Sequence, residues 1–323
     1  MSSKKWLSAT GACVVLALGV TACGDDESDS TSGGDSPSGL SGKITIDGSS
    51  TVQPFAEAAA ELFGEENPQV DISVGAAGTS GGFEKFCAGE TDISNASRPI
   101  EPEEQELCDK DGVEYTEVPV ANDGISVVTN PGLEISCLTV DQLAQLWSDD
   151  TVTNYSDLGD DADTGEPLPD TEVSLYGPGT DSGTFDYFTG EINGEEGVSR
   201  QDYQASEDDN VLVQGVGGDT SGLAYFGFSY YEQNADALNL VAVDGGEGCV
   251  APSSEAIQDG SYTPLSRPIF MYPSVEAMAK PEVAGFMEFI SANYETIAEQ
   301  SLIVPMSEEQ GAEAQSAIEK AAG

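Results

Sequence analysis

The chain contains no histidine, and basic residues are scarce in it. Ten lysines and arginines stand against 59 aspartates and glutamates, so the formal net charge at pH 7 is −49. The absence of histidine excludes Ser-His-Asp and Cys-His catalysis, and histidine-ligated metals as well. The scarcity of basic residues argues against nucleic-acid binding, which depends on lysine and arginine contacts with phosphates. The acidic field also repels anions, so a site for an anion must attract its ligand locally.

Long apolar runs are missing too, apart from a short one near the N-terminus. Two lysines precede a mostly apolar stretch over residues 6–20, which ends in Val20-Thr21-Ala22-Cys23. The stretch is shorter than the about 20 apolar residues of a transmembrane helix. We therefore predict that residues 1–22 are a cleaved signal peptide. The cleavage region resembles a bacterial lipobox, which implies a diacylated Cys23 that anchors the protein to the membrane. The alternative is an ordinary secretory signal with an incidental cysteine.

The rest of the chain divides by composition and pattern. Residues 23–42 are rich in Asp, Ser and Gly, and we expect them to be a disordered acidic linker. From residue 43, short β-rich runs alternate with helical patterns, which indicates an α/β fold. This length suggests two lobes. Extended segments near residues 118–128 and 239–243 would cross between them, which gives lobe I residues 43–122 plus 242–323 and lobe II residues 123–241.

Four cysteines remain once Cys13 and Cys23 are set aside. An even number in an exported protein favours two disulfides, for which three connectivities exist. We favour a local Cys87–Cys108 loop and a long-range Cys137–Cys249 bridge. The alternative is a four-cysteine metal site, but the sequence has no CxxC spacing, and we expect no metal.

Three loops rich in Gly, Ser and Thr share one arrangement. Residues 48–51, 75–82 and 177–185 each follow a predicted strand and precede a predicted helix. Helix N-termini present unpaired N–H groups and a partial positive charge, and hydroxyls add neutral donors, so such loops bind anions. One such loop alone is most often only an N-cap. Three of them without a lysine point to one anion site, and none has the GK[ST] ending of a nucleotide-binding loop.

The segment Asp92–Ile100 is a fourth candidate. It contains Arg98, one of three arginines in the chain, between Ser97 and Pro99. A guanidinium offers a planar set of donors that suits an oxyanion. The alternative is a structural ion pair with one of the many carboxylates, and the same alternative applies with more force to Arg200 and Arg267.

Together these loops resemble those of the periplasmic-type phosphate-binding proteins, and the stretch 215–228 does so as well. The similarity spans nearly the whole chain after residue 43, in matching order. It implies a type II-like, two-lobed α/β receptor that binds inorganic phosphate in the interlobe cleft and delivers it to the permease of an ABC importer. Carried over position by position, it implies phosphate-binding roles for Ser50, Thr51, Val52, Thr79, Ser80, Ser97, Arg98, Ser182, Gly183 and Thr184.

Two positions depart from the family pattern. Ser97 stands where an aspartate commonly accepts the proton of phosphate, and Pro178 stands near the place of an arginine. We expect Arg98 to supply the missing charge, so that Arg98→Ala weakens phosphate binding by orders of magnitude. Asp123 or Asp181 would accept the proton, although Asp181 has the alternative role of a helix cap. Because sulfate carries no proton at neutral pH, this acceptor bears directly on selectivity.

Three other functions remain open at this stage. The chain would otherwise be a receptor for another tetrahedral oxyanion, such as sulfate, molybdate or tungstate. An exported phosphatase would use Ser182 or Thr51 as its nucleophile, but it would lack a histidine base. A surface adhesin or phosphate sensor would use the same scaffold. We expect a monomeric binding protein outside the cytoplasm, with no enzymatic activity and no cofactor.

Overall fold

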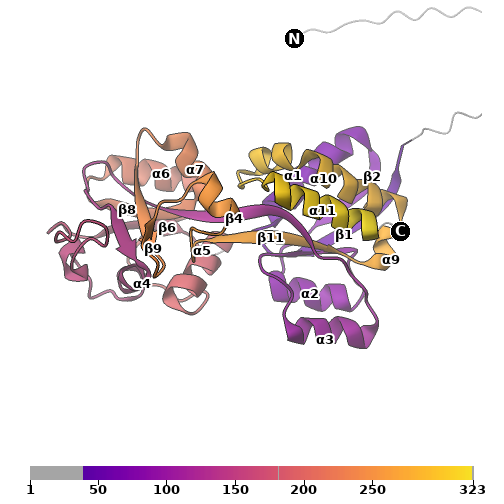
Figure 1. Cartoon of the computed structure of the whole chain (residues 1–323), viewed down its shortest axis with the longest axis horizontal. Helices are drawn as coiled ribbons and strands as arrows, with labels where there is room; N and C mark the ends of the chain where they lie inside the picture. Colours follow the sequence, from indigo (N-terminus) through magenta and orange to yellow (C-terminus); the bar gives the residue numbers. More distant parts are fainter. Residues whose placement is uncertain (1–38, 181, 322–323) are drawn as a thin grey trace, which may run out of the picture. The chain divides into compact units, whose positions relative to one another are not determined.

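The computed structural model describes residues 39–180 and 182–321 (Figure 1). The predicted signal peptide, Cys23 and Asp181 lie outside these residues. From Gly39 onward the chain forms one compact unit, built from a mixed β-sheet and the helices that cover it.

In the described part of the chain, eleven strands form the sheet. Eight follow one path in the order β2-β1-β3-β11-β4-β8-β6-β7, and β9 pairs with β4, β5 and β10. The strands are β1 (Ser41–Gly48), β2 (Gln69–Val74), β3 (Ile93–Ala96), β4 (Val118–Thr129), β5 (Cys137–Thr139), β6 (Ser174–Pro178), β7 (Gln204–Ser206), β8 (Gly222–Gly227), β9 (Asn239–Asp244), β10 (Cys249–Val250) and β11 (Ser266–Pro273).

The helices lie on both faces of this sheet (Figure 1). They are α1 (Gln53–Glu66), α2 (Thr79–Cys87), α3 (Pro102–Asp111), α4 (Val140–Ser148), α5 (Gly183–Phe188), α6 (Asp209–Gly218), α7 (Phe228–Asn234), α8 (Ser254–Gln258), α9 (Val275–Met278), α10 (Pro281–Ser301) and α11 (Glu308–Ala321), with a 3-10 turn η1 (Tyr155–Leu158) and a π turn η2 (Thr189–Asn193).

The first half of the sheet contains β1, β2 and β3, which run parallel, and β11, which pairs antiparallel with β3. Along β1, Ile44 and Ile46 alternate with less buried residues, as expected for a strand with one face in a core. Helices α1 and α10 pack on one face, where Phe63 meets Phe286 edge-to-face. Helices α2 and α3 cover the other face, over a smaller cluster.

The second half has its own hydrophobic clusters. Strands β4, β8, β6 and β7 carry it, and Trp147 lies at its centre against Tyr225 and Phe188. Helix α6 packs on β8 with a separate apolar cluster around Val216. The cluster around Trp147, drawn mostly from residues 125–265, is thus separate from the cluster around α1 and α10.

Three segments connect the two halves. Strand β4 runs through both, and β11 returns beside it in antiparallel register (Figure 1). The third is the segment before α11, in which Val304 exchanges backbone hydrogen bonds with Asn122 of β4 and packs in the Trp147 cluster. Val243 and Leu265 also belong to that cluster. This favours β11, rather than a segment near residue 242, as the place where the chain returns to the first half of the sheet.

Local predictions agree with the structure except at a few boundaries. The expected strand at residue 43 begins at Ser41, within the predicted linker. The helix expected from Phe83 begins four residues earlier, at Thr79. Gly78 has a φ of +81°, a left-handed conformation that glycine adopts without strain, and it turns the chain directly into α2.

Both predicted disulfides are confirmed. Cys87 at the end of α2 is bonded to Cys108 of α3, and Cys137 of β5 is bonded to Cys249 of β10. The first joins the two helices on one face of the sheet. The second ties the short strands β5 and β10 together on either side of β9.

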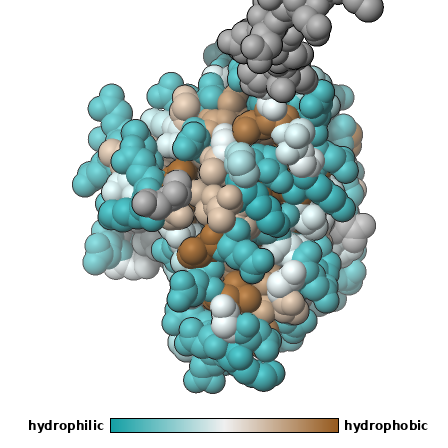
Figure 2. Space-filling model, turned by 90° about the vertical axis from the view of Figure 1, so that its right-hand side faces the viewer, coloured by the Kyte–Doolittle hydropathy of each residue, from teal (hydrophilic) through white to brown (hydrophobic). Residues whose placement is uncertain are grey.

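The surface agrees with the acidic composition. Figure 2 shows a face of the molecule on which hydrophilic residues dominate. In the described residues, we find no helix whose length and apolar character would let it cross a membrane.

Candidate functional site

Residues from distant parts of the sequence surround a cavity of about 260 Å³. Strands β1, β2 and β3 run parallel, so their carboxyl ends and the loops that follow meet at one edge of the sheet, where α/β proteins commonly bind ligands. The cavity is lined by Ser49, Ser50, Thr51, Ala77, Gly78, Thr79, Ser80, Gly81, Ser97, Arg98, Gly183, Asp186, Tyr187, Glu196 and Arg267.

The first two loops are held together by Asp47. Its carboxylate accepts hydrogen bonds from the backbone N–H of Gly48 and of Ala77, at 2.9 Å each, and it pairs with Lys85 of α2. Burial opposes these contacts, but Lys85 and the two N–H groups lower the pKa of Asp47 below its usual value. Gly48 itself, with a φ of +139°, lies against the backbone of Asn95, where no side chain fits.

The second loop and the end of β3 share a hydroxyl network. Thr79 Oγ1 lies 3.0 Å from Ser97 Oγ and accepts a hydrogen bond from Ser97 N at 3.3 Å. Both side chains line the cavity. Since a hydroxyl donates one hydrogen bond and accepts others, this pair retains the capacity to bind an anion.

The third loop meets the first one across the cavity. A Cβ atom added to Gly183 would lie 2.5 Å from Thr51 Oγ1, 2.8 Å from Thr51 N and 2.9 Å from Ser50 Oγ. Glycine is therefore required for the two loops to approach this closely. The loops that the sequence singled out as anion-binding thus meet around one cavity.

Arg98 lines the cavity but has several protein partners. Its Nη1 and Nη2 atoms each donate to Glu104 at 2.9 Å, and Nη2 also donates to Ser80 Oγ at 3.0 Å. Glu101 adds a third carboxylate oxygen, 3.3 Å from Nε. The guanidinium is thus largely used in joining α3 to the start of α2, so the structural ion pair considered from sequence is present.

Arg267 is a functional candidate that received little support in the sequence analysis above. Its Nη2 atom donates to Thr51 Oγ1 at 3.3 Å, and its Nε donates to Asp123 Oδ2 at 3.4 Å. The guanidinium also lies over the ring of Tyr187, 3.5 Å from the centroid. With 19% of its side chain exposed, Arg267 is less exposed than Arg98 at 30%. It brings a charge directly to the first loop.

One signal in the sequence points to Arg267. The tetrapeptide Ser-Arg-Pro-Ile occurs twice, at 97–100 and at 266–269. Because β11 pairs antiparallel with β3, with Phe270 opposite Ala96, the two copies lie next to each other at the same edge of the sheet. Both also line an adjacent hollow of about 340 Å³.

Val52, Ser182, Thr184 and Asp123 adjoin residues of the lining without lining the cavity themselves. Val52 N and Thr184 N already have acceptors, Ser49 O and Ser182 Oγ. Asp123 faces Arg267 across the β4–β11 pair. Burial raises the pKa of Asp123, and Arg267 opposes that change. Arg200 contacts Asp202 and backbone carbonyls, away from the cavity.

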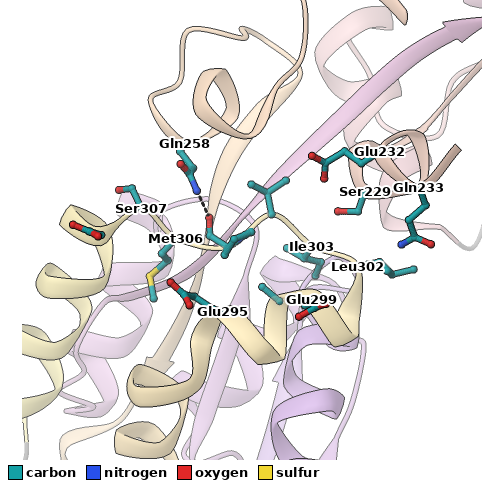
Figure 3. A pocket seen from close by; sticks show the side chains of 14 residues that line it. Ser229, Glu232, Gln233, Gln258, Glu295, Glu299, Leu302, Ile303, Met306 and Ser307 are labelled. Carbon is teal, nitrogen blue, oxygen red and sulfur yellow. Dashed lines mark hydrogen bonds between the residues drawn. The ribbon is translucent and has the colours of Figure 1, made fainter. Parts of the chain in front are cut away.

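A larger cavity, of about 700 Å³, lies between α7, α8 and the residues that join α10 to α11 (Figure 3). Four glutamates line it, and its described lining contains no lysine or arginine. Gln258 crosses it to donate to the Pro305 carbonyl, at 3.0 Å. An anion is not expected there, so the 260 Å³ cavity is the candidate site.

Comparisons with known proteins agree with this choice. Residues 30–293 match a PBP superfamily domain. Protein SphX from Synechocystis is 42% identical over 91% of this chain and 84% of its own length. Phosphate-binding protein PstS from Staphylococcus saprophyticus is 35% identical over 99% of this chain and 96% of its own length. The crystal structure of a "possible phosphate binding protein" from Planctomyces limnophilus is 39% identical, with a TM-score of 0.80, over 88% of this chain and all of that one.

These matches confirm the predicted fold class, a two-lobed α/β periplasmic binding protein. PstS and the Planctomyces limnophilus protein are binding proteins by name rather than enzymes. The chain therefore belongs to the PBP superfamily and, within it, to the family that contains the PstS phosphate-binding proteins and SphX.

Proposed function

We propose that the protein is an extracytoplasmic receptor that captures inorganic phosphate and delivers it to the permease of an ABC importer. The observation that carries this proposal is the meeting of three hydroxyl-rich loops and two arginines around one 260 Å³ cavity. Directed N–H and O–H donors replace the hydration shell of an anion in such a site. The names of the relatives support phosphate as the ligand.

The proposed ligands of phosphate come from several segments. The first loop contributes donors before α1, the second contributes hydroxyls at the start of α2, the third closes the cavity from the other side, and Ser97 and Arg98 follow β3. They are Ser50, Thr51, Val52, Thr79, Ser80, Ser97, Arg98, Ser182, Gly183 and Thr184, to which the structure leads us to add Arg267.

Of the two arginines, Arg267 is the one we propose as the main charged ligand. Arg98 is held by two hydrogen bonds to Glu104, whereas Arg267 has one longer contact with Asp123 and already reaches Thr51. We therefore expect Arg267→Gln to weaken phosphate binding by about 10- to 150-fold, the value of a hydrogen bond to a charged group. Arg98→Gln is expected to cost less, which revises the prediction made from sequence alone.

Calorimetric titration of the mature chain with phosphate and with sulfate tests the proposal. Phosphate should bind at micromolar concentration or below, and sulfate should bind far more weakly. Binding of sulfate alone would assign the cavity to another oxyanion. Hydrolysis of p-nitrophenyl phosphate that is lost on Ser182→Ala would point instead to a phosphatase.

We further propose that residues 1–22 are removed and that Cys23 carries the lipid that anchors the protein, as a monomer, to the outer face of the cell membrane. The residues from 23 to the start of β1 at Ser41 would act as the linker. Lobe I would comprise residues 43–122 with the C-terminal part of the chain. Lobe II would comprise the residues from 123 to β11, the strand at which the chain crosses back. Cys23→Ser should release the protein from the membrane fraction; retention of the variant there would contradict a lipid anchor.

A further inference from the structure

The 700 Å³ cavity lies between the two halves of the molecule. Ser229 and Glu232 of α7 and Gln258 of α8 line it from the second half, whereas α10, α11 and the residues between them line it from the first (Figure 3). Its volume is in the range of small-molecule binding sites. Because both halves contribute to the lining, the shape of this cavity depends on how the halves are placed relative to each other.

The 700 Å³ cavity and the 260 Å³ cavity lie on opposite faces of the β4–β11 pair. Asn122 of β4 donates from Nδ2 to the carbonyl of Pro305, which lines the larger cavity, at 3.0 Å. The next residue, Asp123, faces Arg267, which lines the smaller cavity. Since successive side chains of a strand point to opposite faces, the strands that connect the halves also separate the two cavities.

This arrangement links the sizes of the two cavities. On the face of the smaller one the halves are in contact, since a Cβ atom added to Gly183 would lie 2.5 Å from Thr51 Oγ1. On the opposite face the halves leave the larger cavity between them. A hinge rotation about β4 and β11 that parts Gly183 from Thr51 brings α7 and α8 toward α10. The larger cavity therefore shrinks as the smaller one opens.

Apolar side chains form part of the lining of the larger cavity. They belong to Leu302, Ile303, Val304 and Met306, in the segment after α10. Leu302 has a φ of +57°, and among the described residues it is the one non-glycine residue with a positive φ. Glycine is the usual residue where a helix ends in this conformation, and strained residues of this kind cluster at functional sites. Leucine at this position keeps an apolar side chain in the lining despite the strain.

The carboxylates of the same lining lack partners of opposite charge. Glu295 and Glu299 lie four residues apart on α10, so they are neighbours on one helix face and repel each other. Glu308 begins α11 beside the same cavity. Within residues 39–180 and 182–321, none of these three carboxylates forms a hydrogen bond or an ion pair. A ligand with a positive charge and an apolar body is complementary to both parts of the lining.

We propose that the 700 Å³ cavity binds an organic cation with an apolar body, and that its occupation holds the two halves in the arrangement that binds phosphate. The coupling rests on the proposed function, whereas the binding of the cation does not. A ligand stabilises the arrangement to which it binds best. Cation and phosphate should therefore each strengthen the binding of the other, by the same factor.

The probe is 1,8-diaminooctane, which has two ammonium groups joined by a long methylene chain. Its control is 1,3-diaminopropane, which carries the same charge on a shorter chain. In calorimetry with the mature chain, diaminooctane should bind at least about tenfold more tightly, because each buried methylene strengthens binding about fourfold. Saturating diaminooctane should raise phosphate affinity about fivefold or more. Equal affinities of the two diamines would mean adsorption on the acidic surface and would overturn the proposal.

Two double variants test whether the cavity, rather than the overall charge, binds the cation. Glu295→Gln with Glu299→Gln should weaken diaminooctane binding about fivefold, the value of two exposed ion pairs. Glu309→Gln with Glu313→Gln is the matched control, because these glutamates are exposed and four residues apart on α11 but do not line the cavity. The control should bind diaminooctane nearly as the unmodified chain does. Equal weakening in the two double variants would contradict the cavity as the site.

Ser229→Trp tests the coupling without a cation. Ser229 lines the cavity from α7, so an indole there fills part of the space. This variant should no longer bind diaminooctane and should bind phosphate more tightly than the unmodified chain. If saturating diaminooctane left the phosphate affinity of the unmodified chain unchanged, the coupling would be refuted, and that titration needs no variant to fold. Failure of the unmodified chain to bind phosphate would instead refute the proposed function, while the diamine titrations would still test the cation site.

Discussion

Replacement of Gly183 by alanine tests whether the third loop must touch the first one for the ligand to bind. The added Cβ would lie 2.5 Å from Thr51 Oγ1 and 2.8 Å from Thr51 N. A Cβ atom does not approach non-bonded heavy atoms so closely. One of the two contacts is with the backbone N of Thr51, which cannot rotate away as a side chain can. The loops must therefore move apart around the cavity.

The size of the effect follows from this overlap. Inserting a methyl group into a well-packed contact typically costs about 1–3 kcal/mol. That cost falls on the arrangement in which both loops surround the ligand, so phosphate affinity should drop by about 5- to 150-fold. Stability without phosphate should change less, because the loops can move apart and the helix propensity of alanine offsets part of the overlap. Gly183 is the first residue of α5, and alanine is favoured over glycine in helices by about 0.5–1 kcal/mol.

Calorimetry with phosphate and thermal unfolding without it separate these two effects. Gly64→Ala is the matched control, because Gly64 lies in α1 and an added Cβ there meets nothing within 4 Å. The control should be slightly stabilised and should bind phosphate as the unmodified chain does. If Gly183→Ala kept the full affinity, the contact between the two loops would not belong to the binding arrangement, and the reasoning would be refuted.

Three further predictions concern stability and charge. Asp161 accepts four backbone N–H groups, which outweigh the effect of burial and lower its pKa below 3.8. Because its folded-state pKa is depressed, ionised Asp161 stabilises the fold at neutral pH. In urea unfolding at pH 7, Asp161→Asn should therefore lower the free energy of unfolding by about 1.5–3 kcal/mol. The loss should be smaller below pH 3.8, as the carboxyl becomes protonated. A disulfide stabilises a fold mainly by restricting the unfolded chain, and more so when it closes a longer loop. Removal of Cys137–Cys249, with a sequence separation of 112, should lower the free energy of unfolding by about 4.7 kcal/mol, and removal of Cys87–Cys108, with a separation of 21, by about 3 kcal/mol. Equal losses would contradict this dependence on loop length. Finally, the association rate of phosphate, measured by stopped flow, should rise as the salt concentration is raised from about 0.01 to 0.15 M, because salt screens the repulsion by the acidic surface. A rate that falls instead would mean that the cavity attracts phosphate over long range.

Local features of this chain were predictable from sequence because they depend on neighbouring residues. The strand-loop-helix units around Thr51 and Thr79 follow from alternation, glycine and helical spacing, and the structure places both loops at one cavity. The disulfides were predictable because exported cysteines pair and few pairings existed. The start of α2 was missed because Gly-Gly after Thr79 suggested a loop, whereas the turn is made at Gly78.

The preference for Arg267 over Arg98 as the proposed charged ligand was not predictable in this way, because it depends on contacts between distant residues. Arg98 and Arg267 have the same local sequence, and only the register of β11 against β3 and β4 brings the second one to Thr51. Which arginine is already paired also depends on α3, which carries Glu104.

The composition and the site can be understood together. A chain with 59 acidic and 10 basic residues cannot attract an anion by its overall charge, and adding lysines at the cavity would only create new ion pairs with nearby carboxylates. Hydroxyl and backbone N–H donors avoid this problem, because they attract an anion at short range and are not neutralised by surface carboxylates. In the described lining, the charged donors are two arginines, each fixed by a carboxylate partner, and the rest of the donors are neutral. Such a site depends on geometry rather than on net charge, which is why a single methyl group at Gly183 should affect it more than any change at the acidic surface.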